Sequence, residues 1–252
     1  MRHATAARGC ASVAVLVPCY NEAGTIADCV EQLSQLPDIN TVLLIDDGSQ
    51  DGSSEICAAL ADQPFPGVKA LLLAQNSGKS AAVREGVRAV STEFVIVFDA
   101  DMTVSPTSVE AVLQALREHP LTFVYGSRFR GNTAPAGMSL AHRLGNRFFA
   151  RWVSLLLHRE IGDILCGLKA GPREVLSNIP ASACRWGDFD LFFGAADAGL
   201  RFVEIPVVYA SRRAGKSKMH TLSAGLYFAY LCAGRTLRAL VQATPRQRPA
   251  TK

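Results

Sequence analysis

Short runs of aliphatic and β-branched residues recur through the first half of the chain, separated by segments with helical spacing. Short apolar runs between turn-forming residues are typical of buried strands. Strands that alternate with helices build a parallel sheet with helices on both faces. The pattern predicts an α/β fold with a Rossmann-like, doubly wound and mostly parallel sheet, with strands at 12–17, 41–45, 68–73, 94–98 and 122–125.

Each of the first four predicted strands leads into a polar cluster. In a parallel sheet, ligands bind beyond the carboxyl ends of the strands, near the point where the strand order switches. We therefore expect carboxylates, a lysine and a tyrosine to meet in one crevice. The clusters are Pro18-Cys19-Tyr20-Asn21-Glu22, Asp46-Asp47-Gly48-Ser49, Asn76-Ser77-Gly78-Lys79 and Asp99-Ala100-Asp101.

Asp99 and Asp101 directly follow the predicted strand at 94–98. Mg²⁺ and Mn²⁺ bind carboxylate oxygens and complete their shells with water and substrate phosphates. The pair therefore predicts a divalent-cation site that anchors a diphosphate. An isolated Asp-x-Asp is usually a solvated turn, so this interpretation depends on the neighbouring clusters.

Asp46 and Asp47 are adjacent acids at the end of a buried strand, where they repel each other unless a donor or a ligand compensates. Their carboxylates are suited to a ribose or a base N–H, whereas Ser49 and Ser53 are equally explained as helix caps. Lys79 is predicted at a helix start, where the helix dipole disfavours a cation. We expect this lysine to face an acidic or phosphorylated partner.

After Gly126 the alternation stops, and a helix is predicted at about 139–157. It carries an apolar stripe beside an arginine stripe. A basic amphipathic helix fits a membrane interface, but periodicity alone fits equally well a helix packed on the sheet. The apolar stripe consists of Leu140, Leu144, Phe148, Trp152 and Leu155, and the basic one of Arg143, Arg147 and Arg151.

A last strand is predicted at 202–208, followed by a basic loop at 212–218 and a final helix at about 222–240. The uncharged part of this helix is shorter than the roughly 20 residues that span a bilayer. It could lie on a membrane, be buried in the protein or form a dimer contact. The polar, proline-containing tail at 244–252 is expected to be disordered.

Composition limits the binding partners, the class of protein and the cellular compartment that we expect. The net charge of +4 is concentrated as basic residues in the second half, which suits an anionic ligand or an anionic membrane surface. No interleaved aromatics or reading helix indicate nucleic acid, and no G-x-G-x-x-G follows the first strand, which excludes a dinucleotide-binding oxidoreductase. Seven cysteines without paired spacing, and an N-terminus too short in apolar residues for a signal peptide, lead us to expect a cytoplasmic protein.

Seven motifs occur together: Val17-Pro-Cys-Tyr-Asn-Glu22, Asp46-Asp-Gly-Ser-Gln-Asp-Gly-Ser53, Asn76-x-Gly-Lys79, Asp99-Ala-Asp101, Gly126-Ser-Arg128, Asp163 with Cys166-Gly167, and Arg213-x-Gly-Lys-Ser-Lys218. As a set they resemble the inverting family 2 glycosyltransferases of GT-A fold, and among these the dolichol-phosphate mannose synthases and related polyprenyl-phosphate glycosyltransferases. The resemblance implies a GT-A catalytic domain over residues 1–220. Residues 221–252 would then form a C-terminal amphipathic helical appendage and a tail.

The resemblance also implies roles for individual positions. One group would bind the nucleotide, with Asp46 or Asp47 reading the base, and two acids would bind Mg²⁺ or Mn²⁺. Thr103 stands where many relatives have a glutamine ligand, which leaves the metal preference open. The nucleotide group is Pro18, Tyr20, Glu22, Asp46, Asp47, Lys79 and Asp99, and the metal pair is Asp99 and Asp101.

Basic residues would hold the acceptor phosphate or the departing diphosphate, because a guanidinium fork matches phosphate oxygens and neutralises developing charge. Arg128 is the foremost candidate, followed by Arg143, Arg213 and Lys218. Asp163, Asp188 and Asp190 are candidates for positioning the sugar or the acceptor.

The acceptor class depends on whether a base is needed. Relatives read aromatic-Asp-x-Glu-Leu near the end of the domain, whereas Phe189-Asp190-Leu191-Phe192 keeps the Asp and lacks the Glu. A phosphate monoester is already ionised near neutral pH and needs no base, unlike a sugar hydroxyl. We therefore expect transfer of a hexose from a UDP- or GDP-sugar to polyprenyl phosphate at the cytoplasmic membrane face. The alternatives are a soluble hydroxyl acceptor and a non-catalytic nucleotide-sugar binding module, and a homodimer or a membrane-protein partner stays open.

Overall fold

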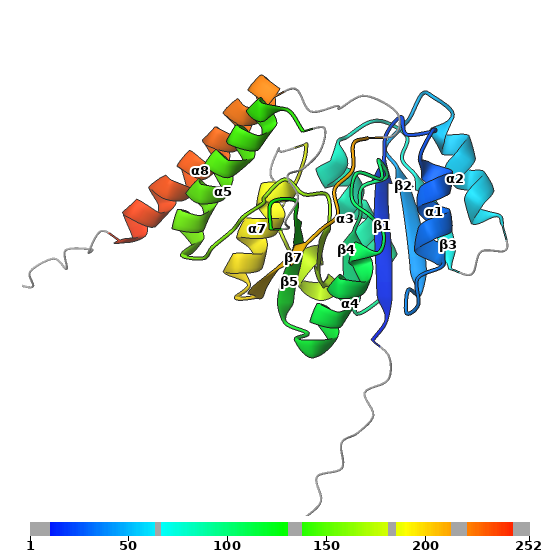
Figure 1. Ribbon diagram of the computed structural model, residues 1–252, viewed down its shortest axis with the longest axis horizontal. Helices are drawn as coiled ribbons and strands as arrows, with labels where there is room; N and C mark the ends of the chain where they lie inside the picture. Colours follow the sequence, from blue (N-terminus) through cyan, green and yellow to red (C-terminus); the bar gives the residue numbers. More distant parts are fainter. Residues whose placement is uncertain (1–10, 64–66, 131–137, 181–184, 213–220, 244–252) are drawn as a thin grey trace, which may run out of the picture.

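Seven strands form a single sheet in the order β3-β2-β1-β4-β6-β5-β7 (Figure 1). The computed structural model describes residues 11–63, 67–130, 138–180, 185–212 and 221–243. All neighbouring strands are parallel except β6, which runs antiparallel to both β4 and β5. The strands are β1 (Val13–Cys19), β2 (Thr41–Asp46), β3 (Val68–Leu72), β4 (Phe94–Val97), β5 (Thr122–Ser127), β6 (Lys169–Pro172) and β7 (Arg201–Pro206).

The mostly parallel sheet and each of its six predicted strands are confirmed. β6 was not predicted, because Lys-Ala-Gly-Pro shows neither an aliphatic run nor alternation. Its ladder to β4 places Lys169 opposite Val97, so a short strand that carries a lysine lies in the interior of the sheet. The helices between the strands are α1 (Ile26–Ser34), α2 (Ser53–Ala61), α3 (Lys79–Ala89), α4 (Ser108–Glu118), α5 (Leu140–Leu157), α6 (Arg173–Ser177) and α7 (Asp188–Asp197), and α8 (Thr221–Ala243) follows β7.

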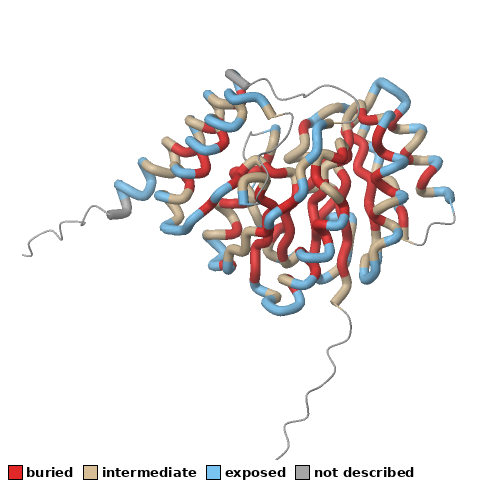
Figure 2. Tube along the Cα trace, in the orientation of Figure 1, coloured by how far each residue is buried: buried red, intermediate tan, exposed pale blue. Residues whose placement is uncertain are grey.

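Two cores cover the two faces of the sheet, because successive strand residues point to opposite sides. On β1, Val15 contributes to the core beneath α1, α2 and α4, and Leu16 to the core beneath α3, α5, α7 and α8. Figure 2 shows the buried strands between these helical layers. The chain runs from β1 outward through β2 to β3, and then returns to place β4 on the other side of β1. The carboxyl ends of β1 and β4 therefore flank the switch in strand order, where a ligand site is expected.

The helix predicted at 139–157 is α5, but of the five residues in its predicted apolar stripe only Trp152 packs against the core. Leu140, Phe148 and Leu155 are 68%, 58% and 70% exposed. The helix instead buries the neighbouring face through Phe149 and Val153. The alternative in which the stripe packs on the sheet is therefore wrong for these three positions.

α8 lies beside α5 and contributes to the same core (Figure 1). Phe228 stacks on Phe189 of α7, with ring centroids 4.5 Å apart, and meets the edge of Phe149 at 5.6 Å. The indole N–H of Trp152 donates a hydrogen bond of 3.2 Å to Thr236. Within the described ranges, the helices are all too short or too polar to cross a membrane. The tail at 244–252 lies outside the described residues.

Candidate active site

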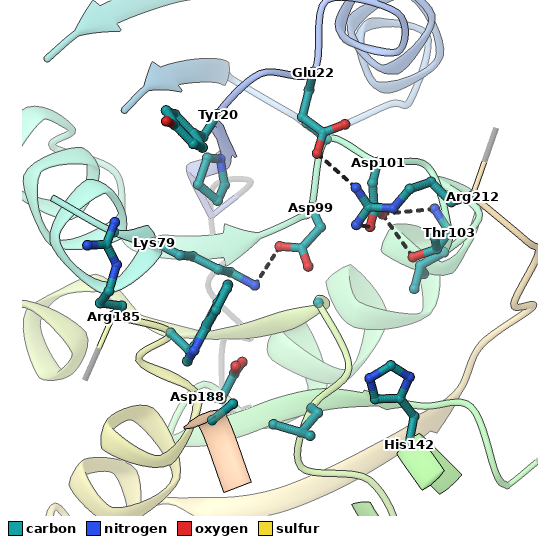
Figure 3. A pocket seen from close by; sticks show the side chains of 18 of the residues that line it. Tyr20, Glu22, Lys79, Asp99, Asp101, Thr103, His142, Arg185, Asp188 and Arg212 are labelled. Carbon is teal, nitrogen blue, oxygen red and sulfur yellow. Dashed lines mark hydrogen bonds and ion pairs between the residues drawn. The ribbon is translucent and has the colours of Figure 1, made fainter. Parts of the chain in front are cut away.

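A cavity of about 1040 Å³ opens at the carboxyl ends of the strands. Its walls come from the ends of β1 and β4, the start of α3, the end of β5, and the N-terminal parts of α5 and α8. Members of all four polar clusters of the sequence therefore meet in one place, and Figure 3 shows three of the clusters through Tyr20, Lys79 and Asp99. Predicted site residues among the lining are Pro18, Tyr20, Glu22, Asp47, Lys79, Asp99, Asp101 and Arg128, together with Thr103.

Lys79 and Asp99 form the ion pair at the centre of the cavity, with Nζ and Oδ1 2.5 Å apart (Figure 3). Burial lowers the pKa of Lys79, but the carboxylates of Asp99 and Asp188 more than offset it, so the pKa of this ammonium lies above its ordinary value. Burial raises the pKa of Asp99, and Lys79 offsets this only in part. Gly167 leaves the room that Asp99 needs, since a Cβ there would lie 2.2 Å from Asp99 Oδ2. The acidic partner expected for Lys79 is present.

Asp101 lies at the acidic end of the cavity, beside Arg212. The Arg212 guanidinium donates to Asp101 Oδ2 at 2.6 Å and to Glu22 Oε1 at 3.0 Å. Asp101 Oδ1 accepts hydrogen bonds from the backbone N–H and the hydroxyl of Thr103, at 3.1 and 2.9 Å. Thr103 therefore orients the carboxylate of Asp101.

Asp47 lines the cavity and at the same time organises the loop before α3. Its carboxylate accepts hydrogen bonds from the backbone N–H groups of Ser77 and Gly78, at 2.8 and 2.7 Å, and from the Asn76 amide at 2.9 Å. These bonds place the start of α3, and with it Lys79, against the ends of β1 and β2. The charge repulsion expected at this strand end is thus relieved by backbone donors.

Asp46 does not line the cavity, so its assignment to the nucleotide is not supported. The carboxylate is buried and accepts hydrogen bonds from the hydroxyls of Ser49 and Ser54, the second at 2.6 Å. It closes the turn between β2 and α2. Adjacent acids in a sequence point to opposite faces of a strand, which is why only one of the two reaches the crevice.

Arg128 reaches the cavity already paired with Asp163. Two hydrogen bonds, of 2.7 and 2.8 Å, join its guanidinium to the carboxylate, and its backbone N–H donates a third of 3.0 Å. Burial lowers the pKa of Arg128, but the hydrogen bonds to Asp163 more than compensate and the pKa is raised. Asp163 is fully buried and outside the cavity lining, so it positions Arg128.

Asn146 of α5 holds the loop that carries Asp163. Its amide oxygen accepts hydrogen bonds from the backbone N–H groups of Ile164 and Leu165, at 3.3 and 3.2 Å, and its amide nitrogen donates to Gly162 O at 3.4 Å. This buried asparagine therefore ties α5 to the Arg128–Asp163 pair.

Asp188, at the first turn of α7, faces the cavity and pairs with Lys169 of β6 at 2.6 Å. Lys169 also donates to Cys166 O at 2.5 Å, which leaves a buried ammonium well satisfied. Asp190 lines a smaller hollow of about 40 Å³ behind Trp186, not the main cavity. Of the acids proposed to position the acceptor, Asp188 alone lines the main cavity.

The three other basic residues predicted to hold a phosphate have different outcomes. Arg143 is exposed and absent from the cavity lining, where α5 presents His142 and Asn146, so the structure does not support its role toward a phosphate. Arg213 and Lys218 lie outside the described residues. Sequence reasoning gave no role to Lys169, Arg212, His142 or Asn146. Of these, only Arg212 carried a signal, as part of the basic loop.

The oxygen atoms of Asp99 and Asp101 fit a hard divalent cation. Both carboxylates face one cavity. Each is already bound by a positively charged side chain, Asp99 by Lys79 and Asp101 by Arg212, so the negative charge at this place attracts cations. No cluster of three His, Cys, Asp or Glu side chains suited to a metal occurs among the residues that the structure describes. Water and substrate phosphates would have to supply the other ligands.

Comparison with solved structures identifies the class. Mannosyl-3-phosphoglycerate synthase from Rubrobacter xylanophilus superposes with a TM-score of 0.67 at 18% identity, over 96% of this chain and 79% of that one. A glucosyl-3-phosphoglycerate synthase from Mycobacterium tuberculosis, in complex with Mn²⁺, UDP and phosphoglyceric acid, gives 0.66 at 19% identity, over 94% and 80%. The fold is therefore that of the GT-A glycosyltransferases.

Sequence comparison identifies the family. Residues 14–179 match the model of glycosyl transferase family 2, and the chain belongs to this family. Glycosyltransferase AglJ of Haloferax volcanii is 30% identical over 206 residues, or 81% of this chain. Undecaprenyl-phosphate 4-deoxy-4-formamido-L-arabinose transferase of Serratia proteamaculans is 28% identical over 210 residues, or 82% of this chain. The matches span 65% and 62% of these relatives' own lengths.

Proposed function

We propose that this protein transfers a hexose from a UDP- or GDP-sugar to a polyprenyl phosphate, with inversion at the sugar carbon and with bound Mg²⁺ or Mn²⁺. The observation that carries the proposal is how the cavity's acids are engaged. Asp99 and Asp188 are each paired with a lysine, Asp101 and Glu22 share Arg212, and Asp47 is held by backbone donors.

This arrangement favours a phosphate acceptor over a hydroxyl acceptor. A hydroxyl must pass its proton to a free carboxylate oxygen as it attacks, and the carboxylates of this cavity already accept hydrogen bonds from lysine, arginine or backbone N–H groups. A phosphate monoester attacks without such a base. The names of relatives that act on undecaprenyl phosphate support the same acceptor class.

The residues of the cavity have complementary roles in this reaction. Asp99 and Asp101 would hold the cation, which neutralises the diphosphate when bound. Arg128 would receive the acceptor phosphate, because its guanidinium is fixed by Asp163 at the cavity wall. An attack on the sugar carbon from the side opposite the leaving diphosphate gives inversion in a single step.

The outer faces of α5 and α8 suit an acceptor that is held in a membrane. Leu226 and Tyr230 of α8 are 75% and 72% exposed, and α5 likewise exposes the apolar side chains of Leu144 and Phe148. The two helices contain five arginines and no acidic residue, as expected for binding to anionic lipid headgroups. Ser139, His142 and Tyr227 near their N-terminal ends line the cavity, so a lipid tail could leave it along this face.

The assay uses a radiolabelled nucleotide sugar, polyprenyl phosphate and Mn²⁺. The proposal requires that the label appears in the organic extract. Label that stays in the aqueous phase would indicate a soluble acceptor. Absence of turnover with every donor would indicate a non-catalytic nucleotide-sugar binding module. Asp101→Asn should abolish metal-stimulated transfer and lower the melting temperature only slightly, because Arg212 keeps Glu22 as a counter-ion and a strand-end carboxylate contributes little to the core. Full activity of this variant with metal present would remove the anchoring role from Asp101.

A further inference from the structure

Arg212 joins two carboxylates that come from different elements of the cavity wall. Glu22 follows β1 and Asp101 follows β4, and the Arg212 guanidinium reaches the first at 3.0 Å and the second at 2.6 Å (Figure 3). The three side chains are 25%, 8% and 13% exposed, in the order Arg212, Glu22, Asp101, so water screens the contacts only in part. The guanidinium is therefore a strong ligand of both acids.

A divalent cation and this guanidinium compete for the same oxygen atoms. A Mg²⁺ ion binds a carboxylate oxygen at about 2.0–2.1 Å, closer than an N–H donor can approach. Asp101 Oδ1 already accepts two hydrogen bonds from Thr103, and Oδ2 holds Arg212. Two positive groups on one carboxylate repel each other, so an ion that takes Asp101 must loosen its bond to Arg212.

We infer that Arg212 is the exchangeable counter-ion of Asp101: it neutralises this carboxylate until a divalent cation binds there, and then turns toward the diphosphate of the donor. The inference rests on the proposed function, because the donor supplies the new anionic partner. A guanidinium fork suits that exchange, since it binds carboxylate and phosphate with the same two-armed geometry.

The exchange makes metal and nucleotide binding cooperative. Metal alone must displace Arg212 without offering it a new partner, and leaves the largely buried Glu22 with a weaker counter-ion. Metal with a nucleoside diphosphate supplies that partner. The structure therefore predicts weak binding of Mn²⁺ alone and much tighter binding of Mn²⁺ with UDP or GDP.

The experiment measures Mn²⁺ binding to the full chain by the electron paramagnetic resonance of free Mn²⁺, without substrate turnover. Arg212→Gln should bind Mn²⁺ alone about tenfold more tightly than wild type, the scale of one lost charge-assisted hydrogen bond. With UDP or GDP present the gain should vanish or reverse. Arg212→Lys, the milder change, keeps the charge but not the fork and should show a smaller gain in the same direction.

Arg185→Gln is the matched control. Arg185 lines the same cavity, but its guanidinium donates to the amide of Asn76 instead of a carboxylate. The control therefore measures the general effect of removing one positive charge from the cavity. Equal Mn²⁺ affinities of the Arg212→Gln and Arg185→Gln proteins would overturn the inference and leave the proposed function intact. Absence of Mn²⁺ binding in all variants, even with nucleotide, would overturn the metal-dependent function as well.

Discussion

At the scale of single residues, the site depends on charges that are held in fixed pairs. Asp163 is fully buried and Arg128 is 12% exposed, so this pair lies almost outside the reach of water. Breaking a buried pair by removing one partner leaves an uncompensated charge and costs far more than breaking an exposed pair. Replacing an aspartate therefore lowers the free energy of unfolding more where its ion pair is buried than where the pair is exposed.

Asp163→Asn should lower the free energy of unfolding by about 3 kcal/mol, the lower end of the cost of a broken buried pair, because Arg128 keeps its charge and loses its counter-ion. Urea unfolding measures this change. Asp38→Asn is the control: Asp38 and Arg117 form an exposed pair of 2.6 Å, and its loss should cost less than about 1 kcal/mol. Equal losses in both variants would show that Asp163 does not act as a buried counter-ion.

Gly167→Ala should raise the Mn²⁺ concentration needed for half-maximal activity by roughly 10- to 100-fold, the usual effect of disturbing a ligand's surroundings. The added Cβ would lie 2.2 Å from Asp99 Oδ2 and push the carboxylate aside, while the fold tolerates the shift of a side-chain end. Gly145→Ala on α5 is the control, since nothing lies within 4 Å of its added Cβ. An unchanged metal requirement in Gly167→Ala would mean that Asp99 is not a ligand.

At the scale of elements, the sequence predicted what local patterns encode. Buried parallel strands are apolar runs, so each of the six with such a run was found, and the polar clusters at their ends identified the crevice. β6 was not predicted, because it is stabilised by its hydrogen-bonded pairing with β4 and β5 and not by an apolar pattern of its own. The inward face of α5, with Phe149 and Val153, was also missed, because tertiary contacts and not periodicity alone decide which face of a helix is buried.

The same limit applies to individual site residues. Asp47 and Asp46 are indistinguishable in the sequence, and only the direction of the strand separates the one in the cavity from the one in the turn. Lys169 and Asn146 carry no motif, because their roles come from partners that are distant in the chain. Pairings across the fold set these roles, and a single sequence does not record them.

α8 contributes to stability as an element of the domain, although it follows the catalytic motifs. Phe228→Ala should lower the free energy of unfolding by about 3–5 kcal/mol, because Phe228 is 2% exposed and packs on Phe189 and Phe149. Tyr230→Ala, on the exposed face of the same helix, should change it by less than about 0.5 kcal/mol. Similar small losses in both variants would make α8 a separable appendage.

At the scale of the whole molecule, thiols buried in both cores link global stability to pH. Burial raises the pKa of the Cys166 thiol to about 12 and that of Cys232 to about 12. In the unfolded chain both thiols ionise near their ordinary pKa of about 8.5. Between these values the folded state holds protons that the unfolded state has lost, so stability falls as pH rises from about 9 toward 12.

The alkaline loss of stability can be assigned to these thiols with a double variant. Urea unfolding at pH 8 and pH 10.5 should show wild type losing more stability than Cys166→Ala/Cys232→Ala, by roughly 2–2.5 kcal/mol for each thiol. The variant removes the two titrations, whereas buried Tyr125 and the lysines titrate alike in both proteins. The comparison at pH 8 separates the cost of the cavities from the pH effect. Parallel losses in both proteins would show that the two thiols ionise as easily in the folded chain as in the unfolded one.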